Sequence, residues 1–181
     1  MSEVKKIILA VDDDRGIAGS MQRIFNKYPE ITVTNAEDAA GACKKLFSGE
    51  ENKPDALVLD IMMPYGNLDE RTRAILNPDT DPNKLETGLK ILKYLRNKEK
   101  EAKIEPIWVA VITARNAVDV MDEIDCLLKI GDKKYGRIYS KPFNTFELEE
   151  DMAHVLGIKS HVIDVLLPDG YKPPNLESRN E

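Results

Sequence analysis

The chain contains 181 residues, of which 42% are hydrophobic, and its formal net charge is −6. This length accommodates one α/β domain of about 100–150 residues with additional segments, but hardly two such domains. The acidic balance provides no electrostatic footprint for nucleic acid or for an anionic membrane, so direct binding of either is disfavoured.

The cysteines and the apolar runs indicate a reducing compartment and a soluble chain. Cys43 and Cys126 fall in predicted helices, and two isolated cysteines indicate neither a disulfide framework nor a cysteine metal site. The opening run Ile7–Val11 is too short for the apolar core of a signal peptide, and no later run approaches the length of a membrane span. We therefore expect a cytoplasmic protein without membrane insertion.

Apolar runs that are typical of strands alternate with helical periodicities five times along the chain. The predicted strands are Ile7–Val11, Ile31–Thr34, Pro54–Asp60, Ile107–Ile112 and Arg137–Ser140. The predicted helices cover Arg15–Tyr28, Ala36–Phe47, a segment that begins near Leu89, Ala117–Ile130 and Thr145–Leu156. We expect the charged end of the third helix, Arg96–Lys103, to lie on a solvated face. The alternation predicts an α/β fold in which helices cover both faces of a doubly wound, five-stranded parallel sheet.

One segment interrupts this alternation after the third strand. Tyr65–Glu86 is polar and rich in Asp, Asn and Pro, and it is far longer than the roughly 2–6 residues of a usual strand-to-helix connection. We interpret residues 65–86 as an insertion, with a short helix over Leu68–Leu76.

The C-terminal residues differ in kind from the rest. Val162–Leu167 is apolar enough to dock on the domain or on a partner, whereas Pro168–Glu181 has the composition of a disordered segment. The expected organisation is one domain over residues 1–157 and a partly disordered tail over residues 158–181.

Polar residues that could bind a ligand or take part in a reaction follow four of the predicted strands. Asp12 and Asp13 follow the first strand, Asp60 the third, Thr113 the fourth and Lys141 the fifth. Ligands of doubly wound sheets bind outside the carboxyl ends of the strands, so we expect these side chains to meet there. Each residue alone also has an ordinary structural explanation, as a turn residue, a helix cap or a surface charge.

Three carboxylates in one cleft repel one another unless a cation is present. Oxygen ligands of this kind suit Mg²⁺, which keeps open positions for phosphoryl oxygens. One of the acids can then act as a nucleophile toward a phosphoryl group, while the metal, a hydroxyl and an ammonium neutralise the transferring oxygens.

This arrangement resembles the receiver domain of response regulators in two-component phosphorelay signalling. That family has two acids after strand one, an Asp shortly before Met-Pro after strand three, a Thr or Ser after strand four, and Lys-Pro after strand five. The matching residues here are Asp12-Asp13, Asp60 with Met63-Pro64, Thr113-Ala114, Lys141-Pro142 and, at the start of the third helix, Gly88. The resemblance covers roughly Lys5–Leu156 and implies the CheY-like, flavodoxin-like (βα)5 arrangement.

The resemblance also implies a role for each site residue. Asp60 would be the phosphoacceptor, Asp13 a direct Mg²⁺ ligand and Asp12 a ligand directly or through water. The backbone carbonyl of Met62 would complete the protein ligands of the metal. Thr113 and Lys141 would each bind a phosphoryl oxygen, and the Lys141–Pro142 peptide bond would be cis.

The function implied by the resemblance is that of a stand-alone receiver. It would take a phosphoryl group from a histidine kinase or phosphotransfer protein onto Asp60 and then bind a downstream protein target. Such a receiver is a phosphoprotein switch rather than a metabolic enzyme.

The sequence departs from the family pattern at three places. Ile138 occupies the position of the usual switch aromatic, and its neighbour Tyr139 falls on the other face of the strand. The loop Gly131–Gly136 is lengthened on the face that receivers commonly use for dimers, so a homodimer is one expectation. The insertion should lie at the mouth of the site, either as a lid or docking element that selects the phosphodonor or as a tolerated surface segment.

Three other functions compete with this interpretation. A receiver-like module could bind proteins without being phosphorylated. A hydrolase with an aspartyl-phosphate is disfavoured, because Met62 stands where a second acid would be needed. A flavin-binding flavodoxin-like protein is disfavoured, because no Ser/Thr/Gly-rich phosphate loop follows the first strand.

Overall fold

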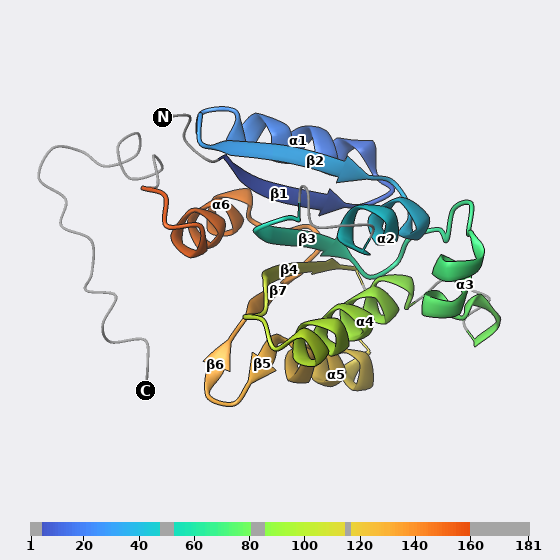
Figure 1. The fold of residues 1–181 in the computed structure, drawn as a ribbon. Coiled ribbons are helices and arrows are strands. Elements are labelled where there is room, and N and C mark those ends of the chain that lie inside the picture. The colour runs from blue at the N-terminus through green and yellow to red at the C-terminus, as the bar shows by residue number, and fades with distance from the viewer. Residues whose placement is uncertain (1–4, 48–52, 81–85, 115–116, 160–181) are drawn as a thin grey trace, which may run out of the picture.

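Five parallel strands form the central sheet of the computed structural model, which describes residues 5–47, 53–80, 86–114 and 117–159 (Figure 1). The strand order is β2-β1-β3-β4-β7. In chain order the strands are β1 (Lys6–Val11), β2 (Ile31–Ala36), β3 (Ala56–Asp60), β4 (Trp108–Thr113) and β7 (Gly136–Ser140). The predicted doubly wound, five-stranded parallel sheet of the CheY-like type is confirmed.

Helices cover both faces of this sheet. One face carries α1 (Arg15–Phe25) and α6 (Thr145–Val155). The other carries α2 (Ala39–Phe47), α4 (Thr87–Ala102) and α5 (Val118–Leu128). None of the helices in the described part of the chain combines the length and the apolar character needed to cross a bilayer.

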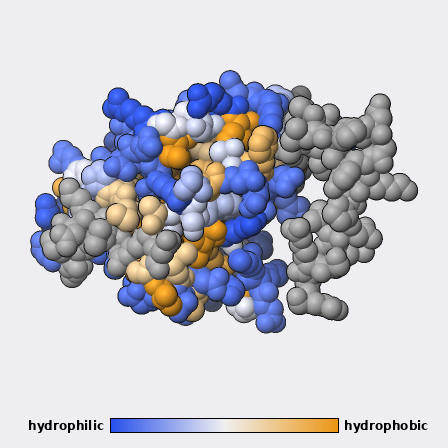
Figure 2. All heavy atoms as spheres, turned by 180° about the vertical axis from the view of Figure 1, so that it is seen from behind, coloured by the Kyte–Doolittle hydropathy of each residue, from blue (hydrophilic) through white to orange (hydrophobic). Residues whose placement is uncertain are grey.

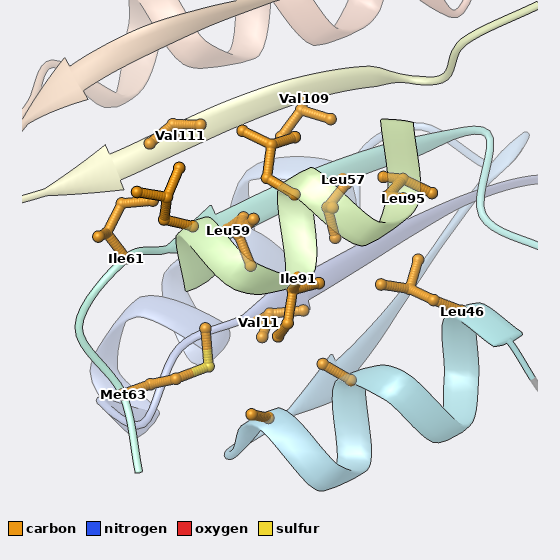
Figure 3. Packing of buried hydrophobic residues seen from close by; sticks show 14 of the residues in the cluster. Val11, Leu46, Leu57, Leu59, Ile61, Met63, Ile91, Leu95, Val109 and Val111 are labelled. Atoms are coloured by element: carbon orange, nitrogen blue, oxygen red, sulfur yellow. The ribbon is translucent and has the colours of Figure 1, made fainter. Parts of the chain in front are cut away.

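The core consists of two apolar layers, one on each face of the sheet. Alternate residues of β1 enter different layers, with Leu9 and Val11 on the α2–α4–α5 side and Ile8 and Ala10 on the α1–α6 side. Figure 3 shows the first layer, in which side chains of β1, β3 and β4 pack against α2 and α4. Burial on both faces explains why the strands are continuous apolar runs. On the face seen in Figure 2, the remaining apolar residues form patches among hydrophilic ones.

The prediction that the charged end of α4 is solvated is wrong for Arg96 and Glu99, which are 7% and 3% exposed. Arg96 Nη1 lies 2.7 Å from Glu99 Oε2, and the guanidinium also donates to the carbonyls of Leu127, Ile107 and Tyr135. Glu99 accepts a second hydrogen bond from the Ile107 amide. Burial of the two charges is tolerated because each is paired and hydrogen-bonded, which residue type alone does not reveal.

A short antiparallel hairpin replaces part of the predicted fourth helix and of the loop after it. It pairs β5 (Lys129–Ile130) with β6 (Lys133–Lys134). α5 therefore ends at Leu128, and Gly131 adopts the positive φ of 62° that the tight turn requires.

The insertion contains α3 (Glu70–Leu76) and the 3-10 turn η1 (Pro78–Thr80), and α3 packs between α2 and α4 (Figure 1). Leu76 is fully buried in the core, and Lys90 of α4 donates to the Tyr65 hydroxyl and to the Asn77 carbonyl. The insertion is thus tied to the domain. Residues 81–85 of the insertion and the tail segments Val162–Leu167 and Pro168–Glu181 lie outside the described residues.

The close contact between the start of α4 and the end of β3 can be tested at Gly88. A Cβ atom there would lie 2.0 Å from the Asp60 carbonyl oxygen and 2.8 Å from Ile61 Cα, so backbone would have to move. We expect Gly88→Ala to lower the free energy of unfolding by about 3 kcal/mol in urea denaturation.

The matched control is Gly19→Ala in α1, where an added Cβ meets nothing within 4 Å. There the gain in helix propensity should stabilise the protein by about 0.5–1 kcal/mol. Equal effects of the two substitutions would contradict the proposed close contact at Gly88.

Candidate functional site

The carboxyl ends of the strands bring the predicted site residues to one edge of the sheet. Asp60 is the last residue of β3 and pairs in register with Ile112 of β4, so Thr113 lies one residue further along the neighbouring strand. Thr113 pairs with Ser140 of β7, and its carbonyl accepts a hydrogen bond of 2.8 Å from the Lys141 amide. Residues far apart in the sequence are therefore neighbours, because parallel strands end at the same edge.

The three acids form a compact oxygen cluster. Asp12, Asp13 and Asp60 each offer a carboxylate oxygen, and these atoms lie within 4.8 Å of one another. Asp12 and Asp60 are 2% and 4% exposed, whereas Asp13 is open to solvent. Such an all-oxygen, acidic and partly open set of donors fits Mg²⁺, which prefers carboxylates and retains water ligands. The acidic cluster is consistent with the Mg²⁺ site of a receiver.

Lys141 bridges two of these acids. Its Nζ lies 2.9 Å from Asp12 Oδ2 and 2.8 Å from Asp60 Oδ2. Burial tends to lower the pKa of the Lys141 ammonium, but the hydrogen bonds to Asp60 and Asp12 outweigh burial and raise it. Lys141 therefore carries a fixed positive charge at neutral pH. The predicted cis bond between Lys141 and Pro142 is present.

The ionised form of the Asp12 carboxyl is only partly stabilised by its neighbours. Burial raises its pKa, and the hydrogen bonds from Lys141 and from the Asp14 amide offset only part of this rise. A carboxylate in such a position gains from additional positive charge nearby. This electrostatic deficit is a second reason why the cluster suits a divalent cation.

Backbone amides orient both buried carboxylates. The Met62 amide donates to Asp60 Oδ1 at 3.0 Å, and the Asp14 amide donates to Asp12 Oδ1 at 2.8 Å. Asp60 is thus held through one oxygen by the backbone and through the other by Lys141. The metal-binding role of the Met62 carbonyl and the phosphoryl-binding role of Thr113 stay predictions.

Gly88 lets α4 begin directly against the site. Its amide donates to the Ile61 carbonyl at 2.9 Å, and the absent side chain leaves room for the Asp60 carbonyl. The sequence singled out Gly88 through the family resemblance alone. The close backbone contact supplies the physical reason.

Ile138 and Tyr139 lie on opposite faces of β7, as predicted. Ile138 packs with the α2–α4–α5 layer, whereas the buried Tyr139 packs with the α1–α6 layer. The Tyr139 hydroxyl donates to the Asp151 carboxylate of α6. Burial and this carboxylate raise the pKa of Tyr139 far above its usual value, so it stays neutral.

One set of contacts near the site was not anticipated from the sequence. The carbonyls of Pro64 and Tyr65 accept hydrogen bonds from the amides of Ala39 and Ala40 at the start of α2. A Cβ on Gly66, whose φ is 72°, would lie 2.2 Å from Asp38 Oδ2. The only sequence signal was the Gly after Met-Pro and Tyr, which indicates a turn but not its partner. These contacts fasten the beginning of the insertion to α2.

The fold and the acidic cluster are the two features that can be compared with known proteins. The chain has the CheY-like fold that is also found in receiver domains, and Asp12, Asp13 and Asp60 form an acidic triad at its site.

Response regulators are among the curated proteins to which the chain is similar. The chain is 35% identical over 113 residues to "Response regulator MprA" of Mycobacterium ulcerans, which is 61% of this chain and 35% of that protein. The protein of the same name from Mycobacterium leprae is 34% identical over 113 residues, 61% of this chain and 36% of that protein. The chain thus spans about a third of the length of these relatives. No protein-family model matches it.

Solved structures show the same fold at low sequence identity. The signal receiver domain of a DNA-binding response regulator from Colwellia psychrerythraea superposes with a TM-score of 0.58 at 21% identity, over 84% of this chain and 99% of that one. A CheY-like receiver domain protein from Methanospirillum hungatei gives a TM-score of 0.54 at 20% identity, over 84% of this chain and 94% of that one.

The metal-binding role of the acids can be tested at Asp13. We expect Asp13→Asn to weaken Mg²⁺ binding by at least about tenfold in titration calorimetry, because it removes an anionic ligand from the solvent side of the cluster.

Asp14→Asn is the control for this change. Asp14 caps α1 by accepting a hydrogen bond from the Gly16 amide, and Asn caps helices equally well. The Mg²⁺ affinity of this variant should stay near that of the wild type. Equal affinities of the Asp13→Asn variant and the wild type would refute the assignment.

Proposed function

We propose that this protein is a response-regulator receiver, which accepts a phosphoryl group on Asp60 from the phosphohistidine of a histidine kinase or phosphotransfer protein. The observation that carries the proposal is the position of Asp60, which is held between the Met62 amide and the Lys141 ammonium beside two further acids. The resemblance to response regulators supports a histidine kinase as the partner.

In the proposed reaction a carboxylate oxygen of Asp60 attacks the phosphorus atom. The bond between phosphorus and the imidazole nitrogen of the donor breaks, and its electron pair stays on the imidazole. When bound, Mg²⁺ supplies positive charge to the transferring oxygens. Asp12, Asp13 and Asp60 would hold it, with the Met62 carbonyl as the further protein ligand.

Lys141 and Thr113 would support the phosphorylated state. Lys141 already pairs with Asp60, so its ammonium is placed to pair with a phosphoryl oxygen added to that carboxylate. Thr113 lies at the end of the adjacent strand, where a hydroxyl can donate to another of these oxygens. The protein would then work as a switch in the cytoplasm, where it binds a downstream protein.

The route from the site to the target-binding face must differ from the usual aromatic switch. Ile138 stands at the aromatic position, and Tyr139 is tied to Asp151 on the opposite side of the sheet. We propose that Thr113 acts on the α4–α5 side through Ile138, which packs in that layer. The same side includes the β5–β6 hairpin and is the proposed surface for a homodimer or target.

We propose that the insertion is a docking element that helps to select the phosphodonor. Its first residues are bound to the start of α2, and Leu76 is anchored in the core. These contacts support a fixed platform rather than a moving lid. In Figure 1 this platform lies at the end of the molecule toward which the strands point.

The phosphoacceptor can be tested with Mg²⁺ and a small phosphodonor such as acetyl phosphate. We expect the wild type to take up label and Asp60→Asn to take up none, because an amide oxygen is too poor a nucleophile.

Asp55→Asn is the control, since Asp55 precedes the same strand at its opposite end and pairs with Lys6. This variant should keep the label. Equal labelling of the wild type and the Asp60→Asn variant would refute the assignment of Asp60 as the phosphoacceptor. A folded wild type that takes up no label would favour a binding module that works without phosphorylation.

The docking role of the insertion can be tested by reversing exposed charges on α3. The double variant Glu70→Lys/Arg73→Glu leaves the buried residues Thr72 and Leu76 in place. We expect it to slow phosphotransfer from the cognate kinase by about tenfold while labelling by acetyl phosphate is unchanged. Unchanged rates with both donors would indicate a tolerated surface insertion.

A further inference from the structure

A trough lies at the end of the sheet opposite the acidic cluster. It consists of two hollows of about 280 Å³ and 630 Å³, both of which open where β3 and β4 begin. Lys53, Pro54 and Ile107 line both hollows, so the two are continuous. None of the residues of the proposed phosphorylation site takes part in them.

The two hollows differ in chemistry. The smaller one has an apolar floor, in which Leu46, Tyr94 and Leu95 form part of the wall, and Ile104 beside them is 48% exposed. Figure 3 shows Leu46 and Leu95 at the end of the core where β4 begins. The larger hollow is polar, and charged side chains of both signs line it, among them Asp55 and Glu105.

Cations surround the apolar hollow, although the protein as a whole is acidic. Lys53, Arg71 and Lys98 lie around it, of which Lys98 pairs with Glu101 at 2.6 Å, and the one acid in its wall, Glu99, is buried and neutralised by Arg96. The hollow therefore favours an apolar segment that carries negative charge.

The described chain ends beside this trough. Val155 and Leu156, in the last turn of α6, line the polar hollow together with His154. The helix ends at Val155, Gly157 follows with a φ of 69°, and the described residues end at Lys159. Figure 1 shows the end of α6 and the β5–β6 hairpin on the side of the molecule where the strands begin.

The residues that follow Lys159 are first polar and then apolar, which is the order of the two hollows from α6 onward. Ser160 and His161 are polar, as is the hollow beside α6. Val162–Leu167 follows and contains five aliphatic residues and one acid, Asp164, which fits the apolar hollow with its surrounding cations. An extended chain from 160 to 167 reaches about 26 Å.

We propose that Val162–Leu167 binds in the apolar hollow of its own chain, between α2 and α4, with Asp164 near the surrounding lysines. The segment reaches it along the polar hollow beside α6. This contact would connect the C-terminal end of the domain to α2 and α4, the two helices against which α3 packs. It is independent of phosphorylation at Asp60.

Trp108 provides the measurement, because it is the only tryptophan of the chain and lines the polar hollow that the segment would cross. In the full chain, Val165→Asp/Leu166→Asp should release the segment. We expect stronger quenching of Trp108 fluorescence by acrylamide, emission at longer wavelength and a melting temperature lower by about 5 °C.

Two further variants make the test specific. Leu176→Asp places a comparable charge in the tail beyond the segment and should leave the fluorescence and melting temperature unchanged. Ile104→Glu alters the hollow itself at an exposed position, so the fold is retained, and it should reproduce the effects of the segment variant.

Two outcomes would overturn the proposal. In one, Trp108 is equally accessible in the wild type, the segment variant and the Ile104→Glu variant. In the other, sedimentation shows a dimer that dissociates on dilution, and Trp108 becomes more accessible to acrylamide at the same dilution. That result would mean that the segment binds in the hollow of a second copy. Labelling of Asp60 by acetyl phosphate is measured on the same samples, so failure of the proposed function is recognised separately.

Discussion

The site depends on the balance between three carboxylates and one ammonium. Asp12, Asp13 and Asp60 lie close enough to repel one another, and Lys141 neutralises only one of their charges. The remaining formal charge of −2 is what a divalent cation cancels. Burial of Asp12 and Asp60 strengthens this demand, because water screens the repulsion less well there. The same surplus of negative charge that would destabilise an ordinary surface suits this cluster to binding a metal ion.

The scaffold keeps these groups in place through backbone contacts. The Met62 and Asp14 amides fix the orientation of the two buried carboxylates, and strand pairing fixes the distance between them. α4 is held at both ends, by the contact of Gly88 with the Asp60 carbonyl and by the buried Arg96–Glu99 pair. Ile138 lies on the side of the sheet that α4 and α5 cover, whereas the Tyr139 hydroxyl is bound to Asp151 of α6.

The segment predicted to be an insertion is fixed to the domain close to the site. This segment begins shortly after β3, its backbone is bound at once to the start of α2, and Leu76 enters the core. The additional surface on α3 is thus presented from a fixed base. Long connections cost little entropy, so such a segment persists whenever its anchoring contacts outweigh that cost.

The sequence by itself determined the five strands, the helices on both faces and the residues at the strand ends, because apolar periodicity and strand-end position are local properties. It also indicated which acids would meet, since parallel strands end at one edge. It failed where a residue's environment comes from distant parts of the chain. Arg96 and Glu99 are charged in the sequence, but they are buried because carbonyls of α5 and of the segments before β4 and β7 receive the guanidinium. Only the tertiary structure decided this, together with the anchoring of the insertion, because hydrogen-bond partners far apart in sequence are chosen by packing and not by residue type.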